Sequence, residues 1–131
     1  MHVEINASKD HDGFFTIVPH GSIDSDTYSA FQDKVNKILV KSTKKILINL
    51  EDVDYISSAG LGVLFTIKKF LHDNSGELLF CNLKPQIVKL FEIVKALPKE
   101  GIFESIQQVD EYLYKMMNQE IDKQKPDKKN L

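Results

Sequence analysis

The topology of this chain is indicated most clearly by residues 52–62, which read Asp52-Val53-Asp54-Tyr55-Ile56-Ser57-Ser58-Ala59-Gly60-Leu61-Gly62. This stretch follows Ile46-Leu47-Ile48-Asn49-Leu50, a short and nearly all apolar run that is typical of an interior strand covered on both faces. After it, apolar residues recur at helical spacing, namely Leu61, Leu64, Ile67 and Leu71. The stretch is therefore predicted to lead from a buried strand into a helix that begins at the serines.

The segment before this turn predicts a hairpin and a helix. Val3-Glu4-Ile5 and Phe14 to Val18 have the composition of two short strands around a turn-rich connection. An amphipathic helix is predicted next, from the spacing of Tyr28, Phe31, Val35, Ile38 and Leu39.

The segment after the turn continues the alternation of strands and helices. Glu77 to Cys81 is predicted as a strand, and Pro85 is placed to begin a third helix. Ile102-Phe103 suits a short strand, and Ser105-Ile106-Gln107-Gln108 fits a capping box that opens a fourth helix. This order predicts an α/β fold with a central, mostly parallel mixed sheet of four to five strands, four helices and an N-terminal antiparallel hairpin.

Length and composition predict a single globular domain and exclude several functions. Of the 131 residues, 42% are hydrophobic and 27% are charged, as in ordinary globular proteins. We expect one domain over residues 1–117 and a polar, disordered tail over 118–131. A net charge of −2 gives no basic surface for direct nucleic-acid binding. Without an export signal or a run of roughly 18 apolar residues, no membrane association is expected, and the predicted location is the cytoplasm.

The turn itself suits an anion. Its glycines permit close backbone approach, and its small residues leave the start of the helix uncovered. Helix N-termini favour negative charge, because their first amides lack partners and the helix dipole is positive there. A phosphoserine would be tolerated at this position and would repel a partner that packs over it. The alternative that Ser57 and Ser58 are only helix N-caps stays open.

Three motifs resemble the STAS domain family, specifically the stand-alone bacterial anti-sigma factor antagonists. Gly21-Ser22-Ile23-Asp24 resembles the Gly-x-Leu-Asp turn of that family, and Asp54 to Gly62 resembles its Asp-Ser-Ser-Gly-Leu-Gly signature. Phe91-Glu92-Ile93 with Leu97 matches the family pattern in the third helix. The resemblance covers about residues 1–117.

The resemblance implies partner switching. The unphosphorylated protein would bind an anti-sigma factor that is also a serine protein kinase; phosphorylation by that kinase would end binding, and a serine phosphatase would restore it. By position, the phosphorylated residue is Ser58, with Ser57 as the alternative. The partner-binding residues implied are Ser22, Asp24, Ser57, Ala59, Gly60, Leu61 and Gly62. The sequence departs from the family at Ser57, where an acid is frequent, and at Ala59.

Other readings are less well supported by the sequence. A hydrolase with Ser58 as nucleophile is not predicted, because the Gly-x-Ser-x-Gly form and a histidine partner are lacking. No cofactor is predicted, since Gly60-x-Gly62 lacks the ending of a phosphate-binding loop. No metal site is predicted either, because the four histidines have no ligand spacing. Asp24 is alternatively a cap of the first helix, and the whole domain is alternatively a non-phosphorylated STAS adaptor for another signalling protein.

Overall fold

The chain begins with two paired antiparallel strands, β1 (His2–Ala7) and β2 (Phe14–His20). Their register runs from His2 opposite His20 to Ala7 opposite Phe15. This is the predicted N-terminal hairpin. The computed structural model describes residues 1–93, 102–103, 111 and 114.

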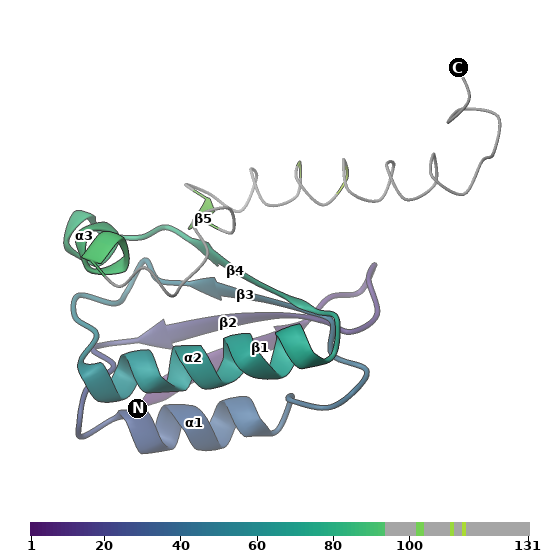
Figure 1. Cartoon of the computed structure of the whole chain (residues 1–131), viewed down its shortest axis with the longest axis horizontal. Coiled ribbons are helices and arrows are strands. Elements are labelled where there is room, and N and C mark those ends of the chain that lie inside the picture. Colours follow the sequence, from purple (N-terminus) through teal and green to yellow (C-terminus); the bar gives the residue numbers. More distant parts are fainter. Residues whose placement is uncertain (94–101, 104–110, 112–113, 115–131) are drawn as a thin grey trace, which may run out of the picture.

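The hairpin forms one side of a five-stranded sheet whose strand order follows the sequence (Figure 1). The remaining strands are β3 (Lys45–Asn49), β4 (Glu77–Cys81) and β5 (Ile102–Phe103). From β2 onward each strand pairs in parallel with the next. The predicted fold class is therefore confirmed, and the number of strands lies at the upper end of the predicted range.

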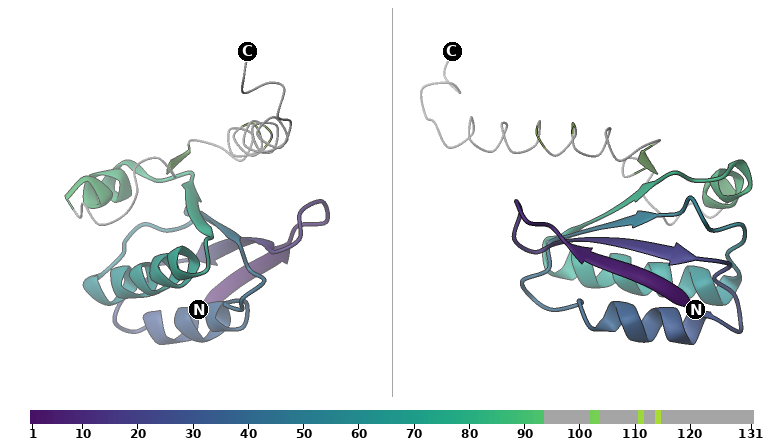
Figure 2. Two further views of the ribbon diagram at one scale, coloured as in Figure 1. Left: turned by 45° about the vertical axis from the view of Figure 1, so that its right-hand side comes forward. Right: turned by 180° about the vertical axis from the view of Figure 1, so that it is seen from behind.

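Among the described residues, three helices lie between parallel strands, namely α1 (Tyr28–Asn36), α2 (Ser58–Asp73) and α3 (Pro85–Ile93). Figures 1 and 2 show α1 and α2 side by side on one face of the sheet. The predicted fourth helix falls mostly outside the described residues; Glu111 and Tyr114, which are described, are helical and exposed. The boundary at residue 117 and the expected tail also lie outside them.

The main core lies between the sheet and these helices. Strand residues alternate between faces, so Ile46 and Ile48 of β3 point toward α1 and α2, and Leu47 points to the opposite face. The apolar sides of α1 and α2 pack against Ile46 and Ile48, and Phe31 and Leu64 are fully buried there. In α3 the ring of Phe91 packs edge-on against Phe80, with 5.0 Å between ring centroids.

A second buried cluster lies on the opposite face of the sheet and consists of Phe14, Leu47, Leu79 and Cys81. Strand β3 is thus buried on both faces, as its apolar sequence predicts. Burial raises the pKa of the Cys81 thiol to about 11, with a smaller contribution from the Glu51 carboxylate. In the part of the chain that is described, no helix is both long and apolar enough to span a membrane.

Candidate functional site

The start of α2 is fixed by Ser57. Its backbone is extended, and its side-chain oxygen accepts a hydrogen bond of 3.2 Å from the amide of Gly60. The Ser57 residue is buried, with 9% of its surface exposed. Ser57 is therefore the N-cap of α2, and its hydroxyl satisfies one of the helix amides that lack an intrahelical partner.

Ser58 differs from its neighbour in exposure. It is the first residue of α2 and is exposed to solvent. The first turn of α2 contains no acidic residue, so the positive end of the helix dipole is not offset within the helix. A hydroxyl at this position is accessible, and a negative charge attached to it would be favoured by the helix.

The loop of residues 21–24 lies directly against this turn, although the two are far apart in the sequence. Ile23 and Ile56 form an isolated parallel bridge. The Ile23 amide donates to the carbonyl oxygen of Tyr55 at 3.0 Å, and the Ser57 amide donates to the carbonyl oxygen of Ile23 at 2.8 Å. These backbone bonds join two of the motifs that the sequence shows separately.

The two glycines of the turn have different environments. A Cβ added at Gly60 would lie 2.5 Å from the Ile23 carbonyl oxygen and 2.9 Å from the Ile56 Cγ2 atom, so only glycine permits this approach. Gly62 is exposed, and a Cβ added there would meet nothing within 4 Å. The fold therefore requires Gly60, whereas the bare surface at Gly62 has no role in packing.

Asp24 organises the loop before α1. Its Oδ1 atom accepts hydrogen bonds from the amides of Asp26 at 2.9 Å and Thr27 at 3.1 Å. Its own amide donates to Thr27 Oγ1 at 2.9 Å, and its carbonyl oxygen accepts from the Tyr28 amide at 2.8 Å. The carboxylate thus caps the turn that precedes α1. The N-cap position of the helix itself is Thr27, so the alternative that Asp24 caps the first helix is not confirmed.

The residues implied as partner-binding differ in accessibility. Ser58 and Gly62 are exposed, while Ser22, Asp24 and Ala59 are half-buried. Three others are buried: Ser57, Gly60 and Leu61. Leu61 has only 8% of its surface exposed and belongs to the core between α2 and the sheet.

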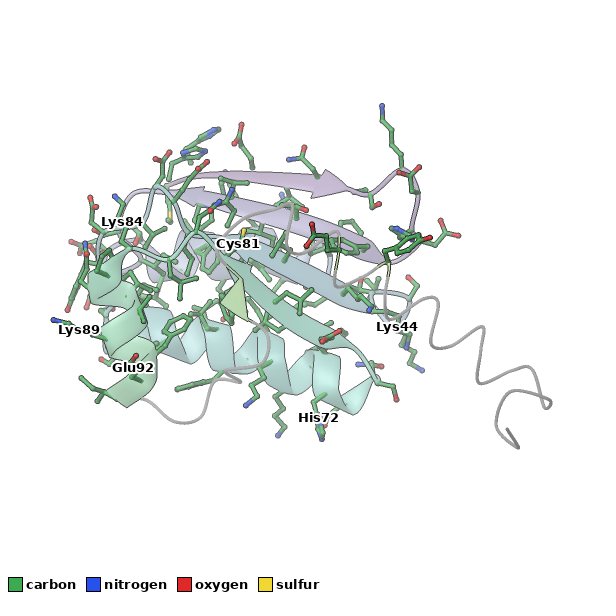
Figure 3. The ribbon with its side chains drawn as sticks, turned by 90° about the horizontal axis from the view of Figure 1, so that it is seen from above. Lys44, His72, Cys81, Lys84, Lys89 and Glu92 are labelled. Carbon is green, nitrogen blue, oxygen red and sulfur yellow. The ribbon has the colours of Figure 1, made fainter. Side chains whose placement is uncertain are left out.

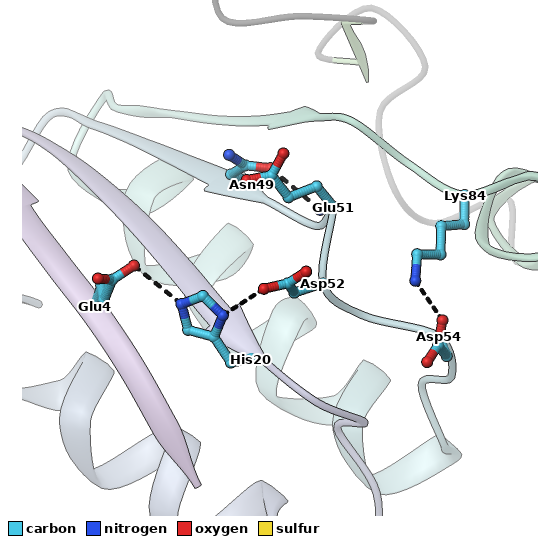
Figure 4. Close-up of polar contacts among 7 residues, drawn as sticks. All are labelled: Glu4, His20, Asn49, Glu51, Asp52, Asp54 and Lys84. Atoms are coloured by element: carbon cyan, nitrogen blue, oxygen red, sulfur yellow. Dashed lines mark hydrogen bonds and ion pairs between the residues drawn. The ribbon is translucent and has the colours of Figure 1, made fainter.

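The structure adds residues that the sequence does not single out. Tyr55 leaves 56% of its surface exposed beside the serines, a large share for an aromatic residue. Lys84 comes from the connection between β4 and α3 (Figure 3) and forms an ion pair with Asp54 (Figure 4). Gln86 donates to the Asp54 carbonyl oxygen at 3.3 Å. The exposed Tyr55 is recognisable within the motif, but the contacts of Asp54 have no sequence signal because they join distant segments.

Comparisons with known proteins identify one matching domain family and several similar sequences. The STAS domain family matches residues 7–109. A putative anti-sigma factor antagonist, BtrV of Bordetella bronchiseptica, is 33% identical over 63% of this chain and 71% of its own length. An anti-sigma-B factor antagonist of Staphylococcus aureus is 32% identical over 63% of this chain and 76% of its own.

Solved structures show the same fold at lower identity. The structure of the Bacillus cell fate determinant SpoIIAA in its phosphorylated form superposes with a TM-score of 0.69. The match has 15% sequence identity and covers 86% of this chain and 99% of SpoIIAA.

Proposed function

Because the chain belongs to the STAS domain family, we propose that it is an anti-sigma factor antagonist switched by phosphorylation of Ser58. In the unphosphorylated state it binds an anti-sigma factor that is also a serine protein kinase. The kinase phosphorylates Ser58 and the complex dissociates, and a serine phosphatase restores binding. The names of the two relatives in Bordetella and Staphylococcus support the first part of this proposal.

The observation that carries the proposal is the contrast between the two adjacent serines. Ser57 is buried and its hydroxyl caps α2, so a phosphate there would break the cap and enter a packed site. Ser58 is exposed at the positive end of the same helix. A kinase can reach Ser58 without unfolding the turn, which favours it over Ser57.

In this proposal the chain is the substrate of the kinase and accepts the phosphoryl group. The Ser58 hydroxyl oxygen attacks the γ-phosphorus of ATP, the bond to the β-phosphate oxygen breaks, and ADP leaves. A base on the kinase takes the hydroxyl proton. The phosphatase later adds water across the new phosphorus–oxygen bond and returns serine and inorganic phosphate. Because ATP is consumed, the proposal places the protein in the cytoplasm with its kinase.

Electrostatics account for release after phosphorylation. A phosphoserine carries about −1.5 to −2 charges near neutral pH, and the start of α2 tolerates that charge. A partner that covers the turn must desolvate this phosphate. The desolvation costs several kcal/mol unless a basic group of the partner pairs with the phosphate. Since each 1.4 kcal/mol is about a tenfold change in affinity, binding falls by orders of magnitude.

The partner surface in this proposal consists of two kinds of residue. Ser22, Asp24, Ala59 and Gly62 have accessible surface and contact the kinase around Ser58. The buried Ser57, Gly60 and Leu61 shape the surface without contacting the partner through their side chains. The open surface at Gly62 allows close approach of a partner backbone or side chain.

The test combines kinase assays with binding measurements. The chain is mixed with ATP and a serine-kinase anti-sigma factor from the same organism, and intact-mass spectrometry counts the phosphates. We expect one phosphate per wild-type chain, none on Ser58→Ala, and one on a Ser57→Ala control. Binding of Ser58→Asp to the same kinase should be at least tenfold weaker than binding of the isosteric, neutral Ser58→Asn.

Two results would count against the proposal. Unchanged phosphorylation of Ser58→Ala removes Ser58 from this role and directs attention to Ser57. Absence of phosphate on protein isolated from its native cells under all growth conditions favours the non-phosphorylated STAS adaptor instead.

A further inference from the structure

A cluster of metal-ligating side chains lies on the hairpin, on the sheet face opposite α1 and α2. His2 and Glu4 are two residues apart on β1 and so share a face, while Val3 between them packs into the main core. His20 is the direct cross-strand partner of His2 and therefore lies on the same face. Sequence spacing places His2 and Glu4 on one face, and strand register adds His20 to them.

The distances within the cluster suit a single ion. His20 Nε2 lies 2.9 Å from Glu4 Oε2, and the rings of His2 and His20 stack with 5.0 Å between centroids. One ligand atom from each of the three residues lies within 4.8 Å of the others. Ligands on a tetrahedral zinc ion with bonds of about 2.0–2.2 Å are roughly 3.5 Å apart. Small side-chain movements are therefore enough to close the site around an ion.

A fourth residue orients His20 from the other side of its ring. The Nδ1 atom of His20 lies 2.5 Å from Asp52 Oδ2, so the imidazole is held between two carboxylates (Figure 4). In metal sites a ligating histidine commonly donates its second ring N–H to a carboxylate, which fixes the tautomer and the ring orientation. When Nδ1–H of His20 donates to Asp52, the Nε2 atom carries the lone pair. That lone pair is then available to a metal ion beside Glu4.

We propose that His2, Glu4 and His20 bind one divalent transition-metal ion of the zinc class, with Asp52 as the positioning residue for His20. Two imidazoles and a carboxylate are a donor set that zinc accepts, whereas Mg²⁺ and Ca²⁺ prefer oxygen ligands alone. The charges also match, because the carboxylates of Glu4 and Asp52 together balance a 2+ ion. Glu4 and His2 are exposed, so solvent can supply a fourth ligand and the ion can enter directly.

The test uses the untagged full-length chain and simple metal salts. Zn²⁺ binding is measured by calorimetry and by competition with a chromophoric chelator, and Co²⁺ binding by its visible absorption. We expect one ion per chain, and at least tenfold weaker binding for His2→Gln and His20→Gln. Asp52→Asn should weaken binding by about 10- to 100-fold, the range seen when such an outer carboxylate is removed.

The chain contains two matched controls. His11 lies in the hairpin connection, and His72 lies on the last turn of α2, at the far end of that helix from the serines (Figure 3). His11→Gln and His72→Gln should bind Zn²⁺ as the wild type does, and Mg²⁺ should not compete. In NMR spectra the imidazole signals of His2 and His20 should shift on Zn²⁺ addition, while those of His11 and His72 stay in place.

Several results would overturn the proposal. These are the absence of saturable Zn²⁺ binding by the wild type, equal binding by His20→Gln, or equal loss in the two control variants. Thermal unfolding of each metal-free variant shows whether it is folded, and only folded variants are compared. None of these readouts involves the kinase, so the metal site and the phosphorylation switch succeed or fail independently.

Discussion

The side-chain oxygen of Ser57 accepts a 3.2 Å hydrogen bond from the amide of Gly60, and this bond gives the first of two adjacent serines a structural role. Ser58 is exposed immediately beside it. The two hydroxyls are one residue apart but differ in burial and in hydrogen bonding. Substitution of Ser57 should therefore change mainly the stability of the fold, and substitution of Ser58 mainly the proposed phosphorylation.

Ser57→Ala should lower the free energy of unfolding by about 1 kcal/mol, because the N-cap of α2 is lost. Ser58→Ala should change it by no more than about 0.5 kcal/mol, since an exposed side chain without packing is removed. Urea denaturation followed by circular dichroism measures both. An equal loss in the two variants would show that the cap is not specific to Ser57.

Gly60→Ala should destabilise the fold by about 1–3 kcal/mol, because the added methyl meets the Ile23 carbonyl oxygen and the Ile56 side chain. Gly62→Ala should stabilise it by about 0.5–1 kcal/mol, since alanine is the better helix former and the space is open. The same variant should bind the kinase more weakly if the partner packs on this surface. Urea titrations and calorimetry give the two quantities, and unchanged kinase affinity of Gly62→Ala would remove Gly62 from the interface.

Ser58→Asp should stabilise the isolated domain by about 0.3–1 kcal/mol relative to Ser58→Asn, because a negative charge at the first turn interacts favourably with the helix dipole. The difference should shrink when salt is raised to 1 M, where the Debye length is about 3 Å. Denaturation at low and high salt checks this. A destabilised Ser58→Asp would contradict the idea that the turn tolerates a phosphate.

Asp24→Asn should keep the stability of the wild type, because asparagine offers the same oxygen to the amides of Asp26 and Thr27. Asp24→Ala should cost about 1 kcal/mol through loss of these bonds. If the charge of Asp24 also contacts the kinase, Asp24→Asn should reduce affinity while the unfolding midpoint stays unchanged. Full affinity of Asp24→Asn would limit this residue to its structural role.

Cys81 should be almost unreactive toward thiol reagents at pH 8 in the folded protein. Burial raises its pKa to about 11, so the thiol is protonated and the nucleophilic thiolate is scarce at that pH. The labelling rate should rise toward pH 11, and urea should raise it at pH 8 by exposing the only cysteine of the chain. A dithionitrobenzoate assay follows the reaction, and rapid labelling of the native protein at pH 8 would contradict the buried environment.

The elements of this fold are largely predictable because their signals are local. The apolar run of β3 and the helical spacing from Leu61 to Leu71 each lie within one segment, and both predictions are confirmed. The candidate functional turn also has a local signal, because its motif is continuous in the sequence. Local patterns therefore carry most of the topology, including the parallel pairing that alternating strands and helices impose.

What the sequence does not predict depends on long-range geometry. The bridge between Ile23 and Ile56 and the stacking of His2 on His20 arise from strand placement, so neither has a spacing signal. The different roles of Ser57 and Ser58 depend on which hydroxyl turns inward, and adjacent identical residues cannot show this. Leu61 belongs to the motif whose resemblance implies partner binding, and it also fits the apolar pattern of the helix. In the structure it lies in the core.

The backbone bonds between residues 21–24 and 54–57 constrain how partner choice can change among related chains. Because Ile23 exchanges hydrogen bonds with Tyr55 and Ser57, the shape of either loop depends on the other. A chimera that receives only one loop from a relative would combine two loops that were never selected to fit each other. Transplanting both loops together is therefore the smallest exchange that can be expected to transfer specificity for a relative's partner.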